Sequence, residues 1–117
     1  MQYVDGYVLP VPKKKLKAYT RMARMGERIW RKHGALDYKE CVGDDLRTKW
    51  GIPFPRMMKV KSGEVVIFSY IVFKSRAHRD RVNAKVMKEM EKMCEPKEMP
   101  FDVKRMVYGG FRALVET

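Results

Sequence analysis

The chain has 117 residues, of which 45% are hydrophobic and 34% charged, and this size and composition predict one domain over residues 1–117. Lys and Arg total 26 against 14 Asp and Glu, so the formal net charge is +12 and anionic partners are favoured. Two cysteines are too few for a disulfide-stapled secreted domain, and the longest apolar stretch, residues 65–73, is too short for a membrane-spanning helix, so we expect a cytoplasmic protein with no membrane partner.

The first two predicted elements are a strand and a long amphipathic helix. Residues 3–11 are rich in Tyr, Val and Leu, and Pro10 and Pro12 indicate a sharp turn after this strand. From residue 13 to residue 33, apolar side chains recur every three or four positions, and Gly34 supplies a left-handed stop. This spacing predicts a helix of about five turns.

A short strand and a long loop follow. Residues 36–42 alternate apolar and polar side chains, which predicts a half-exposed strand. Residues 43–63 contain several glycines and prolines and have no sustained period, so we expect a long loop, and loops of this length are more often functional than idle. Trp50 and Phe54 lie in this loop and are expected to be buried.

The third predicted strand is apolar at both its odd and its even positions. Residues 65–73 therefore have no face that suits water, which predicts a central strand covered on both sides. Ser75 is expected to cap a second helix, and Pro96 and Pro100 are expected to end it.

The last predicted strand, over residues 105–115, completes the order strand, helix, strand, strand, helix, strand. Gly109 and Gly110 within it indicate a bulge or a close backbone approach. The order predicts an α+β fold of the ferredoxin-like βαββαβ type, an antiparallel sheet with both helices on one face.

Because the third strand is apolar on both sides, the face of the sheet without helices needs a cover, and a second copy of the chain supplies it. We therefore expect a homodimer with its sheets face to face.

Basic residues are concentrated in the first helix. Nine Lys and Arg against Glu27 alone give residues 13–33 a net charge of +8. One interpretation is that this helix follows a phosphate backbone, as in an RNA or DNA binder. The other is a solvated face of a basic protein, which the scarcity of interleaved exposed aromatic residues favours.

The start of the second helix is a candidate anion-binding site. Ser75, Arg76, His78 and Arg79 lie where free backbone N–H groups and the helix dipole favour a phosphate or carboxylate. The alternative is an ordinary Ser-capped helix with its Arg and His side chains in water, and this alternative is favoured.

Polar side chains on the first two strands suggest a pocket. Asp5 shares the parity of Tyr7, and Tyr38 shares a strand face with Glu40, so burial would raise the pKa of a carboxylate here into a useful acid–base range. The favoured alternative pairs Asp5 with a neighbouring backbone group or basic side chain. The candidate pocket comprises Asp5, Tyr7, Tyr38, Glu40, Trp50 and Phe54.

Soft metal ligands are few and badly spaced. Cys41, Cys94, His33 and His78 include no C-x-x-C or H-x-x-x-H pair, so we expect no metal site. Phosphate-binding loops, dinucleotide fingerprints and nucleophile elbows are also absent from the sequence, and we expect no cofactor.

Several runs spread over nearly the whole chain carry a family resemblance. They include Tyr3-Val4-Asp5-Gly6, His33-Gly34-Ala35-Leu36, Met99-Pro100-Phe101-Asp102 and Tyr108-Gly109-Gly110-Phe111. On these runs the chain resembles the YbaA-like family of small uncharacterised bacterial proteins. The resemblance implies the dimeric α/β-barrel class of ferredoxin-like domains, a superfamily that also contains small monooxygenases, heme-degrading enzymes and stress-response proteins. No activity is established for the family, so no catalytic residue is carried over.

Three functional hypotheses follow. The leading one is a cytoplasmic module that binds or senses a small molecule of unknown identity, in a pocket between sheet and helices gated by the loop that contains Trp50 and Phe54. The second is a cofactor-free or heme-linked oxygenase that uses His33 or His78 as ligand or base. The third is a basic nucleic-acid binder that uses the first helix.

Overall fold

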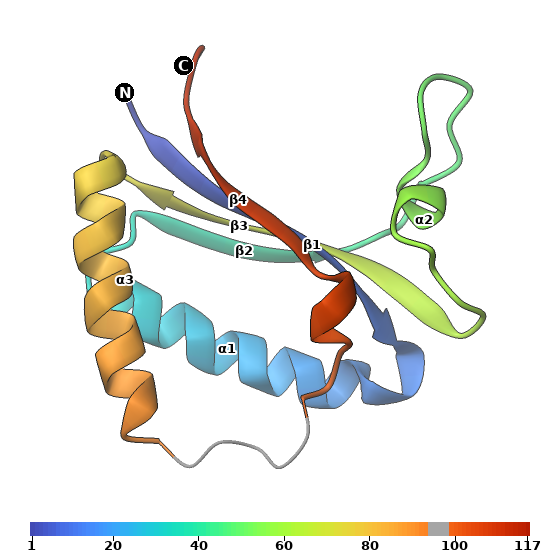
Figure 1. Ribbon diagram of the computed structural model, residues 1–117, viewed down its shortest axis with the longest axis horizontal. Helices are drawn as coiled ribbons and strands as arrows, with labels where there is room; N and C mark the ends of the chain where they lie inside the picture. Colours follow the sequence, from blue (N-terminus) through green and yellow to red (C-terminus); the bar gives the residue numbers. More distant parts are fainter. Residues whose placement is uncertain (94–98) are drawn as a thin grey trace.

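The computed structural model describes residues 1–93 and 99–117. Its strands are β1 (Tyr3–Pro12), β2 (Asp37–Val42), β3 (Glu64–Phe73) and β4 (Val107–Arg112). Its helices are α1 (Leu16–Lys32), the one-turn α2 (Phe54–Met57) and α3 (Arg76–Glu91), with 3-10 turns η1 (Lys13–Lys15) and η2 (Val103–Arg105). The strands form one antiparallel sheet in the order β2-β3-β1-β4, and α1 and α3 cover the same face of it (Figure 1). The predicted α+β, ferredoxin-like βαββαβ fold is confirmed.

The hydrophobic core lies between the sheet and the two long helices. Odd-numbered residues of β1 pair with odd-numbered residues of β3, so both strands turn that set of side chains toward the helices. One buried cluster joins β3 to both helices and contains Ile29, Ala35, Ile71, Phe73, Val82 and Val86. Another joins β1 and β3 to α1 and contains Leu9, Val11, Tyr19, Ala23 and Ile67. Packing of the buried side of α1 against the sheet stabilises this helix more than its intrinsic helix propensity does.

No helix of the described residues combines the length and apolar composition that a membrane span requires.

Two local signals set the helix ends as predicted. Gly34 has a φ of +114°, and its N–H donates to the carbonyl of Arg31 at 3.2 Å, which ends α1. The Ser75 hydroxyl accepts a hydrogen bond of 3.1 Å from the His78 N–H and caps α3. The expected stop at Pro96 lies outside the described residues, as does Cys94.

The last strand is shorter than predicted. It begins at Val107, because residues 103–105 form η2, and the side chain of Asp102 caps this turn by accepting from the Lys104 N–H at 3.0 Å. Gly110 pairs in register with Asp5, so the strand has no bulge there. The glycine instead permits a close approach, since a Cβ at Gly110 would lie 2.5 Å from the Tyr3 hydroxyl oxygen and 2.9 Å from Arg79 Nη1.

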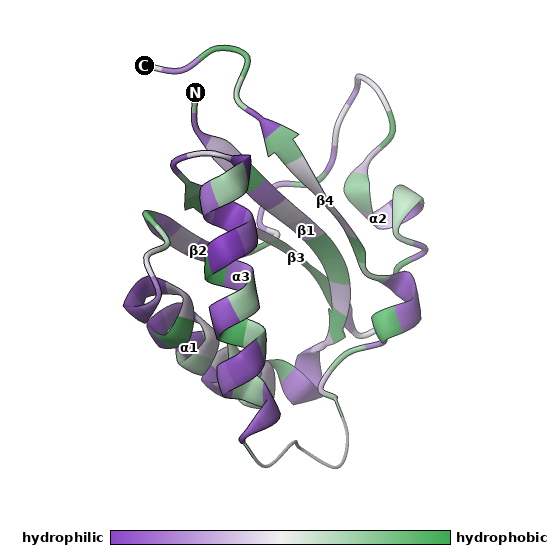
Figure 2. Ribbon diagram, turned by 60° about the vertical axis from the view of Figure 1, so that its left-hand side comes forward, coloured by the Kyte–Doolittle hydropathy of each residue, from purple (hydrophilic) through white to green (hydrophobic). Residues whose placement is uncertain are grey.

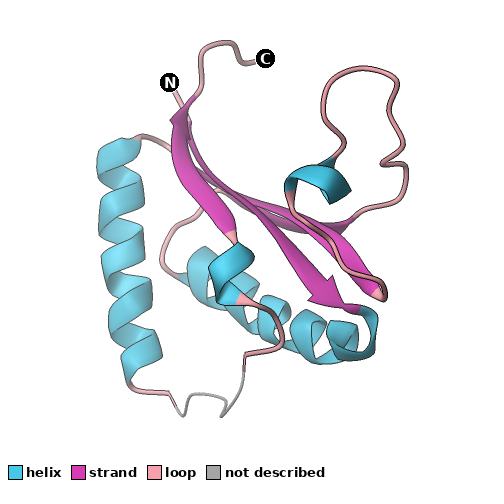
Figure 3. Cartoon of the chain, turned by 45° about the vertical axis from the view of Figure 1, so that its right-hand side comes forward, coloured by secondary structure: helices cyan, strands magenta, loops and turns pink. Residues whose placement is uncertain are grey.

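The loop between β2 and β3 lies on the side of the sheet opposite α1 and α3 (Figure 3). The ring of Phe54 packs edge-on against Phe68 with centroids 6.4 Å apart, and Met58 is buried. Trp50 is 86% exposed, which contradicts its expected burial. Residues 43–63 therefore cover one end of the sheet instead of gating a pocket under the helices.

The rest of that side is an open apolar surface, which we name the helix-free face. It consists of the even-numbered positions of β1 and β3 and their partners on β4. Its apolar residues are Val4, Val8, Phe68, Tyr70, Val72, Val107 and Phe111. Phe111 is 63% exposed, and its ring lies over Gly6 and Gly109, within 3.7 Å and 3.8 Å of where their Cβ atoms would be. The chain thus covers only part of the face that was expected to need a partner.

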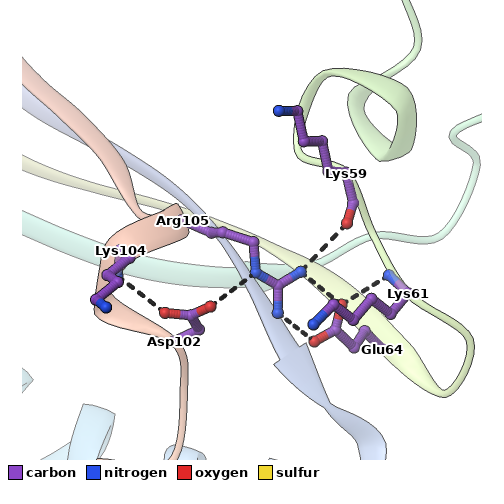
Figure 4. Close-up of polar contacts among 6 residues, drawn as sticks. All are labelled: Lys59, Lys61, Glu64, Asp102, Lys104 and Arg105. Carbon is purple, nitrogen blue, oxygen red and sulfur yellow. Dashed lines mark hydrogen bonds and ion pairs between the residues drawn. The ribbon is translucent and has the colours of Figure 1, made fainter.

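An ion-pair cluster ties η2 to the start of β3 (Figure 4). The guanidinium of Arg105 donates to both carboxylate oxygens of Glu64, at 2.8 Å and 2.6 Å. It also donates to Asp102 at 3.0 Å and to the Lys59 carbonyl at 3.2 Å. The N–H of Lys61 adds a 2.7 Å bond to Glu64. The hydrogen bonds from Arg105 lower the pKa of Glu64 from 4.5 to about 2.

Removal of this carboxylate is expected to change how stability depends on acid. Because the folded-state pKa of Glu64 is lowered, its contribution is present above pH 4.5 and is lost as the pH falls toward 2. Glu64→Gln should therefore lower the melting temperature at neutral pH and flatten the loss of stability below about pH 5. Thermal unfolding between about pH 2 and pH 7 measures both effects. Arg105→Met should behave alike and the neighbouring Lys104→Met should not, whereas an unchanged acid limb in Glu64→Gln would contradict the assignment.

Candidate functional site

Two tyrosines and a glutamate meet between α1 and β2. Tyr38 and Glu40 are two positions apart on β2, so they share the sheet face that α1 covers. The Tyr19 hydroxyl, from the buried side of α1, donates to Glu40 Oε1 at 2.6 Å. The Tyr38 hydroxyl donates to Glu40 Oε2 at 2.6 Å. Each carboxylate oxygen of Glu40 therefore accepts one short hydrogen bond, and each bond comes from a different phenol.

Two adjoining cavities open on this group. The outer cavity, of about 330 Å³, lies between α1 and the edge strand β2, and exposed Arg24 and Val42 are in its wall. The inner cavity, of about 230 Å³, lies between the sheet and the helices, with Trp30 and Ser69 in its wall. Their shared wall consists of Tyr19, Ala23, Tyr38 and Glu40. Met22, Met90, Met99 and Met106 also line the inner cavity.

The close approach of α1 to the sheet depends on a glycine. A Cβ at Gly26 would lie 3.0 Å from the Tyr38 hydroxyl oxygen, closer than most real Cβ contacts. Glycine at this point of the buried stripe lets the helix backbone lie against the phenol. The sequence showed Tyr19, Ala23 and Gly26 only as members of an apolar stripe, so their part in the site was missed.

The phenols of this site stay protonated. Burial raises the pKa of Tyr19 far above its ordinary 10.0, and the hydrogen bond to Glu40 raises it further. Burial also raises the pKa of Tyr38, with the charge of Glu40 as the second cause. The pKa of Tyr7, in the inner cavity, is raised to about 12 by burial and then by the charge of Asp5. All three phenols are therefore protonated at physiological pH, and Tyr19 and Tyr38 donate their protons to hydrogen bonds with Glu40.

Asp5 belongs to a separate polar network. It is 4% exposed and accepts from Arg79 Nη1 at 2.7 Å and from Asn83 Nδ2 at 3.3 Å. The indole of Trp30 donates to the Asn83 side-chain oxygen at 3.0 Å, and the Arg79 guanidinium lies 4.9 Å from the Tyr3 ring centroid. Asp5 does not line either cavity, so its inclusion in the pocket is corrected: its carboxylate binds a basic side chain.

The other two pocket candidates also lie elsewhere. Trp50 and Phe54 are in the loop on the helix-free side of the sheet, where Phe54 packs on Phe68. Of the six predicted pocket residues, the structure therefore brings Tyr7, Tyr38 and Glu40 together at the cavities.

The four residues at the start of α3 do not converge on an anion. The Ser75 hydroxyl is used as the helix cap, and His78 Nδ1 accepts from the Lys74 N–H at 3.0 Å. Arg79 turns inward, where it binds Asp5 and, at 2.8 Å, Asp80. Only Arg76 is left exposed, so the geometry matches the Ser-capped helix instead of the anion site.

Neither histidine reaches the cavities. His33 Nε2 lies 2.7 Å from Glu89 Oε1 at the junction of α1 and α3, and Lys32 binds the same oxygen at 3.0 Å. The two residues that the oxygenase hypothesis assigns as ligand or base, His33 and His78, therefore lie outside both cavities. Cys41 is exposed on β2, and the described residues contain no group of three His, Cys, Asp or Glu side chains arranged to hold a metal.

The comparisons with known proteins give the family. A model described as "Protein of unknown function (DUF1428)" matches residues 2–103. The chain belongs to this family. The chain is also similar to the uncharacterized protein YbaA of Escherichia coli (strain K12), 37% identical over 116 residues with 99% of each chain covered. The uncharacterized protein YbaA of Shigella flexneri matches to the same extent. The resemblance seen in the sequence is thus confirmed at the level of the family.

Among solved structures, the De novo designed protein Foldit4 covers 95% of this chain with a TM-score of 0.44 and 12% identity. A likeness of that size carries no argument about the DUF1428 fold.

Proposed function

We propose that this DUF1428 protein binds a small, largely apolar molecule through a hydrogen-bond donor that reaches Glu40. The observation that carries the proposal is the cavity-facing carboxylate whose two oxygens each accept from a tyrosine at 2.6 Å. A carboxylate has about four lone-pair positions and no proton to donate. A ligand group that fills the remaining positions must therefore be a donor, such as a hydroxyl or an N–H.

The cavity walls indicate the rest of the ligand. The inner cavity is lined mainly by aromatic, aliphatic and methionine side chains, and methionine adapts readily to different apolar shapes. Volumes of about 330 Å³ and 230 Å³ suit a compact molecule of one or two rings. The net charge of +12 disfavours a cationic ligand, so a neutral hydroxyl compound fits better than an amine.

A matched pair of probes tests the anchor. We expect 2-naphthol to bind about tenfold more tightly than its methyl ether, because only the alcohol donates to Glu40 and a hydrogen bond to a charged group is worth about 1.5–3 kcal/mol. Glu40→Gln should remove most of this difference, since its single oxygen is occupied by the tyrosines. Isothermal titration calorimetry of both compounds against both proteins measures it.

Filling the cavity supplies the control. Ala23 lies in the wall of both cavities, so Ala23→Leu should abolish binding of both compounds. Ala84→Leu makes the same change at an exposed position of α3 and should bind as the unchanged protein does. The proposal would be overturned by equal affinity for the alcohol and the ether, by binding that survives Ala23→Leu, or by the absence of binding at millimolar 2-naphthol.

We also propose that a second copy of the chain covers the helix-free face. Phe111 and Val107 are largely exposed there, and contiguous apolar surface of this kind marks an interface. Most of the net charge lies in the two long helices, on the other side of the sheet. Because the molecule is 20 Å across its shortest axis, a face-to-face dimer keeps the two charged sides more than about one Debye length apart. Association through the helix side would bring them together.

A further inference from the structure

Nearly all of the net charge of the molecule lies on one side. Residues 13–33 and 76–92, which we name the helix layer, contain fifteen Lys and Arg against four Asp and Glu. The helix layer therefore carries +11 of the net +12. Hydrophilic residues predominate along α1 and α3 in Figure 2. A charge this one-sided produces a directed field toward an anionic partner.

On α1 the charges form a row. Lys17, Arg21, Arg24, Arg28 and Arg31 follow one another at spacings of four and three residues, which places them along one side of the helix, and all five are exposed. At 1.5 Å per residue the row is about 21 Å long. Four of its members are arginines, whose planar guanidinium binds phosphate oxygens two at a time.

A second row runs along α3. Arg81, Lys85, Lys88 and Lys92 repeat the spacing of four and three residues and are also exposed. Lys85, Lys88 and Lys92 line one depression of about 490 Å³ together with Lys32 from the end of α1. The α3 row therefore lies beside the C-terminal end of α1.

Several of these charges have no acidic partner among the described residues. Among the described ion pairs, Glu89 binds Lys32, but Arg21, Arg28, Lys85 and Lys88 bind no described carboxylate. Mutual repulsion of like charges lowers the stability of the free protein, and a bound polyanion relieves it.

Positive charges near the start of α3 also act on His78. Burial lowers the pKa of His78, and the positive charges of Lys74, Arg81 and Lys85 lower it further.

We infer that α1 and α3 bind the phosphate backbone of a nucleic-acid duplex. A row about 21 Å long spans about six nucleotides at 3.4 Å per nucleotide along one strand, whereas a small anion needs only one or two of its members. The described residues of the helix layer expose Met25 and Met87 but no aromatic side chain, so they offer no platform for the stacked bases of a single strand. Backbone contact with a duplex needs none.

The same surface argues against a lipid membrane. A helix that lies in a membrane interface inserts an apolar side between its charges. The apolar side of α1 is packed against the sheet in the hydrophobic core, with Tyr19, Ala23 and Ile29 all buried. The face-to-face dimer proposed above leaves the helix layer of both copies accessible to a duplex.

Charge reversal in the helix layer tests the inference. The probe is a fluorescein-labelled RNA duplex of mixed sequence, about 20 base pairs long, titrated at several salt concentrations from about 50 mM upward. We expect the logarithm of the affinity to fall linearly with the logarithm of salt concentration. In Arg21→Glu/Arg28→Glu/Lys88→Glu the slope should decrease by about three, one for each lost phosphate contact, and the affinity should fall at least tenfold.

A second triple variant separates the surface from net charge. Arg47→Glu/Lys49→Glu/Arg56→Glu lowers the net charge equally but changes the exposed loop on the other side of the sheet. It should retain the original slope to within about one. The inference would be overturned by equal losses of affinity in both variants or by no duplex binding at about 50 mM salt. It would also be overturned by full competition from inorganic pyrophosphate, or by binding to phosphatidylserine vesicles in preference to the duplex.

The tests of the inference and of the proposed ligand can be separated. Arg21, Arg28 and Lys88 do not line the outer or the inner cavity, so the helix-layer variant should bind 2-naphthol normally.

Discussion

Asp5→Ala is expected to lower the free energy of unfolding by about 3 kcal/mol. The side chain of Arg79 is only 19% exposed, and its guanidinium would keep Asp80 but lose its 2.7 Å partner inside the protein. Asn83 would lose an acceptor in the same change. Breaking a buried ion pair by removing one member costs about 3–5 kcal/mol, and the retained contact to Asp80 places this case at the lower end. Urea denaturation followed by circular dichroism measures the loss.

Two controls define the origin of that loss. Asp37, on β2, is another carboxylate with a basic partner, but its side chain and that of Lys39 are exposed, so Asp37→Ala should change stability by less than about 1 kcal/mol. Asp5→Val/Arg79→Met replaces both members of the buried pair by apolar groups and should recover most of the loss. A similar loss of stability in Asp5→Ala and Asp37→Ala would contradict the role given to Asp5.

Asp5→Asn should leave 2-naphthol binding unchanged, because Asp5 lies outside the cavity walls.

The parts of the fold that could be predicted are those set by local chemistry. The three- and four-residue period of residues 13–33 specifies a helix with one buried side, whatever packs against it. Gly34 and Ser75 act on their own backbone neighbours, so the helix ends they predict need no tertiary information. The double-sided apolar pattern of residues 65–73 likewise allows only an inner strand, which is where β3 lies.

The candidate site was only half predictable for the same reason. Parity on β2 places Tyr38 and Glu40 on one face, but it does not say which residue of the helix comes to lie opposite. Tyr19 meets Glu40 because Gly26 lets α1 approach the sheet, and that distance is set by packing. The partner of Asp5 is 74 residues away in the sequence, and no local pattern links such positions.

The misplaced loop has a similar cause. Residues 43–63 have no period, so no pattern in them indicates which side of the sheet they occupy. In the structure α1 and α3 pack against one side of the sheet. Phe54 lies on the other side, where its ring packs against Phe68. That position changes the role of the loop from a gate to a partial cover of the helix-free face.

The proposed dimer gives the largest expected change in behaviour. Native mass spectrometry and sedimentation at micromolar concentration should show a dimer for the unchanged protein and a monomer for Phe111→Lys. The ring of Phe111 lies over Gly6 and Gly109 and is 63% exposed, so the free subunit loses little when it is replaced. In the dimer, twofold symmetry places two lysines in the apolar interface, and the dissociation constant should rise more than about a hundredfold.

Met25→Lys is the matched comparison because it adds the same charge at an exposed apolar residue of α1. It should remain dimeric, since α1 lies on the side of the sheet away from the interface. A monomeric unchanged protein, or equal weakening by the two variants, would mean that a second copy does not cover the helix-free face. A dimer broken only by Phe111→Lys would show why the charges are arranged as they are: the apolar side joins the two copies, and the +11 helix layers face outward on both surfaces of the assembly.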